Sequence, residues 1–563
     1  MATRRPRLLI PRPDRAGLGA LALYAALAFL VFGRGLVTGP GSRYSGTGRD
    51  PQVFIWSFAW WPHAILHALN PFVTHAVWYP NGFDLMWTTA VPGLALPFAP
   101  LTLAAGAVAS YNVAAVLMPA LAAWTAFLLC RHLTGKLWPS LAGGYLFGFS
   151  SFMLGQELGH MQMTSVFLVP LAVLVVLQYV EGELGGRALV LRLGPLLALQ
   201  LLFSTEVAFT LTLALACSLV VGFAAAPAAR RRLVESIAPL VGAYVLAAVL
   251  TAPFVYYLLA GFHGEPFHHP SAYNTDLLNF VVPTRLTLAG LGWADSIARR
   301  FPGNVGERGA YLGWPALVIV ALFARERLRT AGGRFLLASL AVAALAALGF
   351  ELVVDGNRVV QLPWARFGNG PLFDNVLPER LSLWVSLAVA VIVALWAAAG
   401  GGLLRRLLPA LAILAIVPYA TAGTWDQSYA VPRLFTDGSY RSCFAQGERV
   451  LPLPPTSAGD SNLWQVLSGF RFAMTGGYVG AGPPASFLTS AQVAWIAAGN
   501  PVPPGRAQML RIFIGQKGVT SVVVDRRQIR HWAAALDRIA TPRHVGGVVL
   551  YRIAGSTPGC PAR

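Results

Sequence analysis

Long apolar runs, separated by short turns that carry arginine, dominate the hydrophobic pattern of this chain. The first run, residues 16–37, follows five arginines that all lie within residues 4–15. A run of this length can cross a bilayer as a helix, and positively charged flanks favour the cytoplasmic side. The basic segment 1–15 is therefore predicted to be cytoplasmic, and residue 38 is predicted to emerge on the other face of the membrane.

The same pattern recurs and predicts about eleven membrane helices within residues 16–422. We expect them at residues 16–37, 110–130, 137–154, 163–180, 189–203, 206–225, 236–260, 310–324, 334–353, 380–400 and 407–422. Every turn that this count assigns to the cytoplasm carries arginine or lysine, and the long loops 38–109, 261–309 and 354–379 all fall outside. The stretch 91–103 is interrupted by proline and is predicted to lie in the interface without spanning the membrane.

Residues 423–563 show a different pattern, typical of a small α/β domain. Apolar runs shorten to strand length at 449–453, 520–525 and 548–552, a helical segment is expected at 529–539, and the turns are rich in glycine and proline. Because this segment follows the eleventh helix, the domain and the C-terminus are predicted to be extracytoplasmic.

Composition and charge support a multi-pass membrane protein. Hydrophobic residues make up 56% of the chain and charged residues 12%, whereas about a quarter of a soluble domain is charged. The net charge of +19 does not indicate nucleic acid, because the arginines form short clusters between apolar runs. The Ala, Gly, Leu and Arg bias suggests a GC-rich bacterial genome, so we expect a bacterial plasma (inner) membrane. The chain shows no P-loop, dinucleotide-binding glycine motif or serine nucleophile elbow.

Two cysteines, Cys443 and Cys560, lie in the C-terminal domain. An extracytoplasmic compartment permits a disulfide between them, which would hold the end of the chain in place. Two unpaired thiols are the alternative that the sequence leaves open.

The motif with the clearest chemistry is Gly48-Arg49-Asp50-Pro51, followed by the aromatic-rich segment 53–62. A single carboxylate at the outer membrane surface is where an enzyme acting on lipid-linked substrates would place a general base. The alternative is that Asp50 simply starts a turn before Pro51.

Short motifs along most of the chain resemble the GT-C class of polyprenyl-phosphate-dependent glycosyltransferases, and in particular a poorly characterised bacterial GT-C-like family. They are Asp50-Pro51 with Trp56 and Trp60-Trp61, Trp78-Tyr-Pro-Asn-Gly82, Tyr111-Asn112, Leu133-Thr-Gly135, Gly159-His160-Met-Gln162, Glu307 with Tyr311-Leu-Gly313, Pro378-Glu-Arg380, and Trp464-Gln-Val-Leu-Ser-Gly-Phe-Arg471 with Gly476-Gly-Tyr478. In GT-C enzymes an acidic residue of the first outer loop is the proposed base, which corresponds to Asp50. Many members carry a pair of acidic residues there, whereas Arg49 precedes Asp50 here.

The resemblance implies a sugar donor linked to polyprenyl phosphate, membrane lipid as a partner, and a glycan, lipid or protein of the cell envelope as acceptor. No cofactor is certain, and a divalent metal is left open. Positive charge is needed to stabilise the departing phosphate. The expected phosphate ligands are Arg380, Arg308 and Arg49, with Arg285 and Arg366 as further outward-facing candidates. For Arg380, an interfacial pairing with Glu379 is the alternative.

Four further residues are candidates for an acceptor site or a polar cavity: Glu157, His160, Asp84 and Glu307. Glu157 and His160 are three residues apart and would share a face if the third helix continued through them. With Asp50 they could bind a divalent ion, although two or three ligands are fewer than such ions require. A non-catalytic GT-C-like scaffold for envelope assembly and a transporter of lipid or glycan are the competing functions.

Overall fold

The computed structural model describes residues 14–39, 41–261, 270–366, 368, 370, 373–421, 423–455, 459–503, 505–555 and 560. Most of the predicted cytoplasmic N-terminus, residues 1–13, therefore lies outside the described part. The chain divides into two compact units. The helical unit comprises Met1–Thr38, Asn112–Ala252 and Gly264–Asp426, and the sheet-containing unit comprises Gly39–Tyr111, Pro253–His263 and Gln427–Arg563.

This division differs from the one expected from the sequence. The boundary expected after residue 422 lies close to Gln427, but the first outer loop clusters with the C-terminal segment and not with the helices. Hydropathy detects where apolar runs end, but it carries no information about which polar segments pack together.

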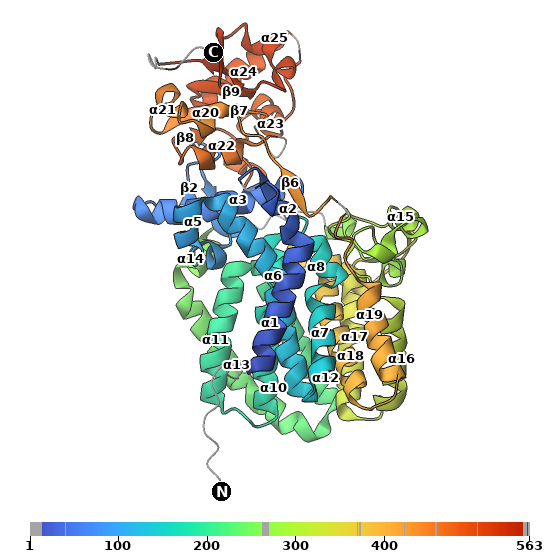
Figure 1. The fold of residues 1–563 in the computed structure, drawn as a ribbon. Coiled ribbons are helices and arrows are strands. Elements are labelled where there is room, and N and C mark those ends of the chain that lie inside the picture. The colour runs from blue at the N-terminus through green and yellow to red at the C-terminus, as the bar shows by residue number, and fades with distance from the viewer. Residues whose placement is uncertain are drawn as a thin grey trace. The chain divides into compact units, whose positions relative to one another are not determined.

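Helices occupy each of the eleven predicted segments. Those of the helical unit are α1 (Arg15–Ala28) with η1 (Phe29–Gly33) and α2 (Arg34–Val37), α6 (Ala107–Thr134), α7 (Leu137–Gly148), α8 (Ser151–Gln156), α9 (Met161–Thr164), α10 (Leu168–Val180), α11 (Gly186–Phe203), α12 (Thr205–Ala225), α13 (Arg230–Leu250), α16 (Trp314–Arg327), α17 (Ala331–Leu348), α18 (Ser382–Ala398) and α19 (Leu404–Ala415). They are labelled in Figure 1 where there is room.

Within the described residues, eight helices are long and apolar enough to cross a membrane. They cover Arg15–Val37, Ala107–Thr134, Met161–Val180, Gly186–Phe203, Thr205–Ala225, Pro227–Leu250, Ala331–Leu348 and Pro378–Ala398. Three helices at predicted positions are shorter: α7 and α19 have 12 residues each and α16 has 14. The multi-pass helical fold is confirmed, and the count of eleven spans stays a prediction. The stretch 91–103 contains only the short helices α4 (Pro92–Ala95) and α5 (Ala99–Ala105).

The core of the helical unit forms where α7 and α17 pack on α18. Helix α7 approaches α18 closely because Gly143 has no side chain: a Cβ there would lie 3.1 Å from the carbonyl oxygen of Ala390. Buried aliphatic residues of α18, such as Ile392 and Val393, fill the centre of this core. A short helix such as α7 is therefore held by tertiary packing and not by its own length.

The sheet-containing unit has a five-stranded sheet in the order β10-β11-β9-β7-β8. Strand β7 (Glu448–Leu453) runs parallel to β8 (Phe472–Met474) and β9 (Ser521–Asp525), while β11 (Val548–Arg552) is antiparallel to β9 and to β10 (Pro542–Val545). Helix α22 (Ser461–Leu467) connects β7 to β8, and α23 (Ala491–Ala497) and α24 (Ala507–Lys517) precede β9. The predicted helical segment 529–539 contains η11 (Ile529–His531) and α25 (Ala533–Leu536).

Helix α3 (Asp50–Leu66) and the segment after it pack against this sheet domain within the same unit. The backbone N–H groups of Trp78 and Tyr79 donate to the carbonyls of Gly476 and Met474, each over 2.9 Å, and Met474 N–H donates to the Ala76 carbonyl over 2.8 Å. These bonds extend the backbone pairing beyond the five strands. A disulfide joins Cys443 and Cys560, the pair that the sequence suggested.

Candidate functional site

Asp50 is the first residue of α3 and not part of a loop. Pro51 follows at the second position, where a missing N–H costs nothing because the first turn leaves its N–H groups without helical partners. An ionised aspartate is favourable in this first turn because the helix dipole is positive there. Behind it, Val53, Phe54 and Trp56 are buried, so the helix is fixed by its aromatic and aliphatic side chains.

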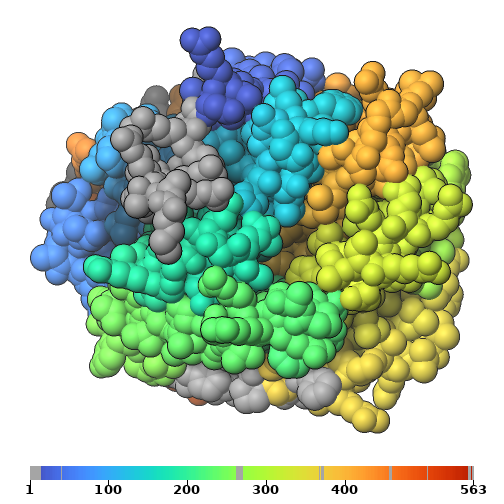
Figure 2. All heavy atoms as spheres, turned by 90° about the horizontal axis from the view of Figure 1, so that it is seen from below, coloured from blue at the N-terminus to red at the C-terminus, as the bar shows by residue number. Residues whose placement is uncertain are grey.

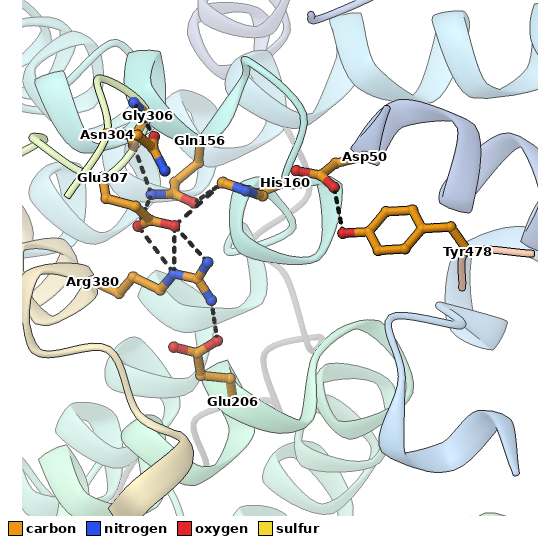
Figure 3. A network of polar contacts seen from close by, with 9 residues as sticks. All are labelled: Asp50, Gln156, His160, Glu206, Asn304, Gly306, Glu307, Arg380 and Tyr478. Carbon is orange, nitrogen blue, oxygen red and sulfur yellow. Dashed lines mark hydrogen bonds and ion pairs between the residues drawn. The ribbon is translucent and has the colours of Figure 1, made fainter. Parts of the chain in front are cut away.

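Tyr478 donates a hydrogen bond from its hydroxyl to Oδ1 of Asp50 over 2.9 Å (Figure 3). Burial, and then the charge of Asp50, raise the pKa of Tyr478 above its ordinary value, so the phenol stays protonated and keeps donating. The side-chain amide of Asn462 holds the backbone by donating to the carbonyl of Tyr478 over 2.6 Å. The C-terminal segment therefore contributes a side chain that contacts the candidate base.

Sequence reasoning did not assign a role to Tyr478. The only signal was its place in Gly476-Gly-Tyr478, one of the motifs that carried the family resemblance.

Arg49, expected at a phosphate, is instead bonded to Asp460 of the C-terminal segment. Gln52 also donates to the same carboxylate, from Nε2 to Oδ1 over 2.6 Å. Both donors come from the start of α3. The ion pair of Arg49 with Asp460 therefore connects this helix to the sheet domain. The partner of the guanidinium is thus an acidic residue 411 positions away in the sequence, and a phosphate contact of Arg49 stays a prediction.

In the helical unit, Arg380 lies between two carboxylates (Figure 3). Its Nε lies 3.1 Å from both carboxylate oxygens of Glu307, one terminal nitrogen donates to Glu307 over 2.5 Å, and the other donates to Glu206 over 2.6 Å. Arg380 belongs to η9 (Pro378–Leu381), Glu206 to the first turn of α12, and Glu307 to the loop before α16. Three segments distant in sequence thus meet at one buried guanidinium.

This geometry bears on the predicted phosphate contact of Arg380, which stays a prediction. The bidentate edge that was expected to face a phosphate is already occupied by Glu307. The pairing partners are Glu307 and Glu206, and within the described residues Glu379 is not among its hydrogen-bond partners. We call Glu206, Glu307 and Arg380, together with His160 and Gln156, the buried polar cluster.

Glu307 has two more contacts in this cluster. Gln156 donates from Nε2 to Glu307 over 3.0 Å, and Nδ1 of His160 lies 3.6 Å from the carboxylate and 2.9 Å from Oε1 of Gln156. Because both neighbouring oxygens are acceptors, Nδ1 of His160 carries the hydrogen. Burial acts to raise the pKa of Glu307, but the charges of Arg380 and His160 and these hydrogen bonds outweigh it and lower the pKa to about 2.

Arg308, also expected at a phosphate, binds its own loop. Its guanidinium donates to the carbonyls of Phe301, Pro302 and Gly303 over 2.6 to 3.0 Å. Burial lowers the pKa of Arg308 somewhat. Arg308 therefore stabilises the turn at 301–303.

Glu157 and His160 do not share a helix face, which corrects a second expectation. Helix α8 ends at Gln156 and α9 begins at Met161, so the chain turns between the two side chains. Glu157 is buried, its Oε1 has no hydrogen-bond partner among the described residues, and burial raises its pKa well above the usual value. Only His160 of this pair joins the buried polar cluster.

Asp84 caps a short turn. Its carboxylate accepts from the N–H of Met86 over 2.8 Å at the start of η2 (Leu85–Trp87). In the part of the chain that the structure describes, no group of three or more His, Cys, Asp or Glu side chains could hold a metal ion. Asp50, Glu157 and His160 therefore do not form such a group.

The helical unit contains an apolar pocket of about 880 Å³, which we call the helical pocket. Residues of α12, α17 and α18 line it, and along α18 the lining extends from Leu381 to Ala399. Seen from below, a hollow opens between the green segment near residues 226–233 and the yellow-green segment near residues 326–333, and both segments line this pocket (Figure 2). The length of α18 corresponds to about 25 Å, close to the thickness of a bilayer core.

The buried polar cluster lies beside one end of the helical pocket. Leu381 of the lining follows Arg380 directly, and Thr210 and Leu211 lie little more than one turn beyond Glu206 on α12. Trp364 and Phe373 line the pocket as well. The pocket therefore runs from beside the buried polar cluster along the full length of α18.

Solved structures of GT-C glycosyltransferases share this fold. The arabinofuranosyltransferase AftD from Mycobacteria matches 97% of this chain at 17% identity and a TM-score of 0.53, but this chain spans only 40% of its length. The oligosaccharyltransferase of Archaeoglobus fulgidus, solved with a tethered acceptor peptide, matches 96% of this chain and 74% of its own at 13% identity and a TM-score of 0.53.

ArnT from Cupriavidus metallidurans, solved with bound undecaprenyl phosphate, matches 96% of this chain and 99% of its own, with 12% identity and a TM-score of 0.51. At such identities the likeness shows the fold alone. No curated protein matches the sequence. The model of a family described as "Domain of unknown function (DUF6311)" matches residues 21–420. The chain has a GT-C membrane fold, and it belongs to the DUF6311 family.

Proposed function

We propose that this protein is an integral membrane glycosyltransferase that moves a sugar from a polyprenyl-phosphate donor to a cell-envelope acceptor. We place the reaction at the extracytoplasmic face of a bacterial plasma membrane, with Asp50 as the general base. The observation that carries the proposal is the helical pocket: an apolar cavity of about 880 Å³ within a GT-C fold.

A polyprenyl chain is a long, flexible hydrocarbon, so it needs an apolar site that extends through the depth of the membrane. The helical pocket has that character, because most of its lining residues are apolar, and α12, α17 and α18 all contribute aliphatic side chains to it. Undecaprenyl phosphate bound to ArnT, which shares the fold, supports a lipid of this class.

The donor phosphate needs a cation near one end of this pocket. Since Glu307 and Glu206 engage Arg380, we assign this role to Arg366, which was among the outward-facing candidates. Arg366 ends η7 (Pro363–Arg366), two residues after the lining residue Trp364, and its side chain is exposed. Among the described residues it has no hydrogen-bond or ion-pair partner, so its guanidinium can form a bidentate contact with a phosphate.

The chemistry requires one base. The acceptor hydroxyl loses its proton to the Asp50 carboxylate while its oxygen bonds to the anomeric carbon of the sugar. The bond between that carbon and the phosphate oxygen breaks, and the electron pair leaves with the polyprenyl phosphate. Asp50 is only partly buried, so an acceptor hydroxyl can reach its carboxylate.

Blocking the helical pocket tests the proposal. Ala214 of α12 lines the pocket, and Ala214→Trp should fill the path of the lipid and reduce transfer of labelled sugar from a synthetic polyprenyl-phosphate donor at least tenfold in nanodiscs. Val220 on the same helix is 71% exposed and lies outside the lining, so Val220→Trp is the matched control and should keep full activity.

Arg366→Gln should weaken binding of the same donor, whereas Arg358→Gln should not, because Arg358 is an exposed arginine already paired with Glu351. Absence of transfer by the wild-type protein with several donor sugars would contradict the enzymatic function and favour the scaffold. Equal activity of Ala214→Trp and wild type would show that the lipid does not bind in the helical pocket.

A further inference from the structure

We propose that Tyr478 is the positioning residue for the reaction, so that the C-terminal domain completes the site around Asp50. This inference rests on the function proposed above and deepens it, because it assigns a part of the reaction to a segment 428 residues away from the base.

The contact between Tyr478 and Asp50 suits a base. A phenol is a neutral donor, so its hydrogen bond fixes the orientation of the carboxylate without neutralising its charge. Arg380 does the opposite for Glu307, whose pKa it helps to lower to about 2 and which cannot accept a proton near neutral pH. Tyr478 thus orients a carboxylate that remains able to take the proton of the acceptor.

Tyr478 is itself held in place from both sides. Asn462 binds its backbone carbonyl over 2.6 Å. On the other side, Gly476 lies two residues before the tyrosine, and its carbonyl accepts a hydrogen bond from the backbone N–H of Trp78. Gly477 has a φ of 124°, and a Cβ there would lie 3.0 Å from the side chain of Val77. Only glycine fits this close approach, so the loop is clamped against the segment that follows α3.

A second tyrosine provides a matched control. Tyr551 of β11 donates to the carboxylate of Asp537 over 2.7 Å in the same unit, and burial followed by that carboxylate likewise raises its pKa. Tyr551→Phe removes a comparable bond without touching Asp50. Any general effect of losing a buried tyrosine hydroxyl should appear equally in both variants.

The experiment compares wild type, Tyr478→Phe, Tyr551→Phe and Asp50→Asn as full-length proteins in nanodiscs. Tyr478→Phe should lower kcat for transfer about tenfold with an unchanged donor KM, because a hydrogen bond to a charged group is lost. The hydroxyl stabilises the ionised carboxylate, so without it the acidic limb of the pH profile should move up by about one pH unit. Tyr551→Phe should change neither quantity.

Labelling with a water-soluble carbodiimide gives a readout that does not depend on turnover. This reagent modifies protonated carboxyl groups, so peptide mapping at pH 5 should find more label on Asp50 in Tyr478→Phe than in wild type. Increased labelling without transfer by any protein would contradict the glycosyltransferase function but leave the contact in place. Transfer by wild type and Tyr478→Phe with the same pH profile and the same labelling would overturn the inference.

Discussion

Asp50 and Glu307 are two carboxylates of this protein with opposite surroundings. Glu307 is 2% exposed, is held by a guanidinium and has a pKa of about 2, so it is ionised near neutral pH. Asp50 is half-buried, begins a helix and meets the neutral hydroxyl of Tyr478. The comparison shows two different contacts of a carboxylate: the oxygens of Glu307 bind a buried guanidinium, whereas Oδ1 of Asp50 accepts from a neutral hydroxyl.

The same contrast distinguishes two of the arginines that were candidates for binding a phosphate. Arg380 is buried between two carboxylates of the helical unit, whereas Arg366 has an exposed side chain two residues after the lining residue Trp364. The arginine of the motif Pro378-Glu-Arg380 is therefore the one whose guanidinium already contacts two carboxylates.

The largest effect is expected from Arg380→Ala. This change leaves Glu206 and Glu307 buried without their cation, which should lower the free energy of unfolding by about 3–5 kcal/mol. Thermal unfolding in detergent measures it. The control is Arg231→Ala, which breaks an exposed pair with Glu235 one helical turn away and should leave the melting temperature almost unchanged. If the melting temperature stayed unchanged and donor binding became weaker, Arg380 would be assigned as a ligand of the donor phosphate.

Removing the disulfide should have the next largest effect, confined to the unit that contains Asp50. The double change Cys443→Ser and Cys560→Ser opens a link across 117 residues and should destabilise that unit by about 2–4 kcal/mol. Differential proteolysis of the C-terminal segment in intact protein measures it. Cys217→Ser, at an exposed free cysteine, is the control and should leave the proteolysis pattern unchanged.

Asp50→Asn should separate chemistry from stability. It keeps the shape of the side chain and removes the proton acceptor, so transfer should fall by about 10²-fold while donor binding and the melting temperature change little. Asp84→Asn is the control, because the amide oxygen can still accept from the N–H of Met86, so both turnover and stability should change little. Full activity of Asp50→Asn would remove Asp50 as the base.

The smallest effect is a dependence of stability on acid. The pKa of Glu307 is about 2 in the folded protein, below its usual value near 4.5. The contribution of ionised Glu307 to the free energy of unfolding is therefore complete above a pH of about 4.5, and it is lost as the pH falls toward 2. The melting temperature of wild type should fall more over this window than that of Glu307→Gln. Equal slopes would show that Glu307 is not the anion described here.

How much the sequence could predict depends on the range of the interaction. The helices and the strands β7, β9 and β11 follow from local apolar patterns, and the disulfide pair follows from compartment and cysteine count. The partners of Arg380 lie 73 and 174 residues away, and Tyr478 lies 428 residues from Asp50. No local periodicity encodes such pairings.

The break between Glu157 and His160 shows a local limit as well. Gly155 and Gly159 lie around the turn where α8 ends, and Gly155 approaches the backbone so closely that a Cβ would lie 2.2 Å from the carbonyl oxygen of Gly306. Glycine inside an apolar run is compatible with a continuous helix or with its end. Tertiary contact with the loop before Glu307 decides between them.

Residues 39–111 pack against residues 427–563 in one unit, so the first part of this unit is synthesised long before the second. The ribosome makes the first segment before the helices that separate it from the second, and at ordinary elongation rates the intervening stretch takes about 15–60 seconds to complete. During that interval Trp56 and Trp78, which are fully buried in the finished protein, have no C-terminal domain to cover them. A chain truncated before β8 should therefore be a substrate for membrane quality control and not a stable fragment.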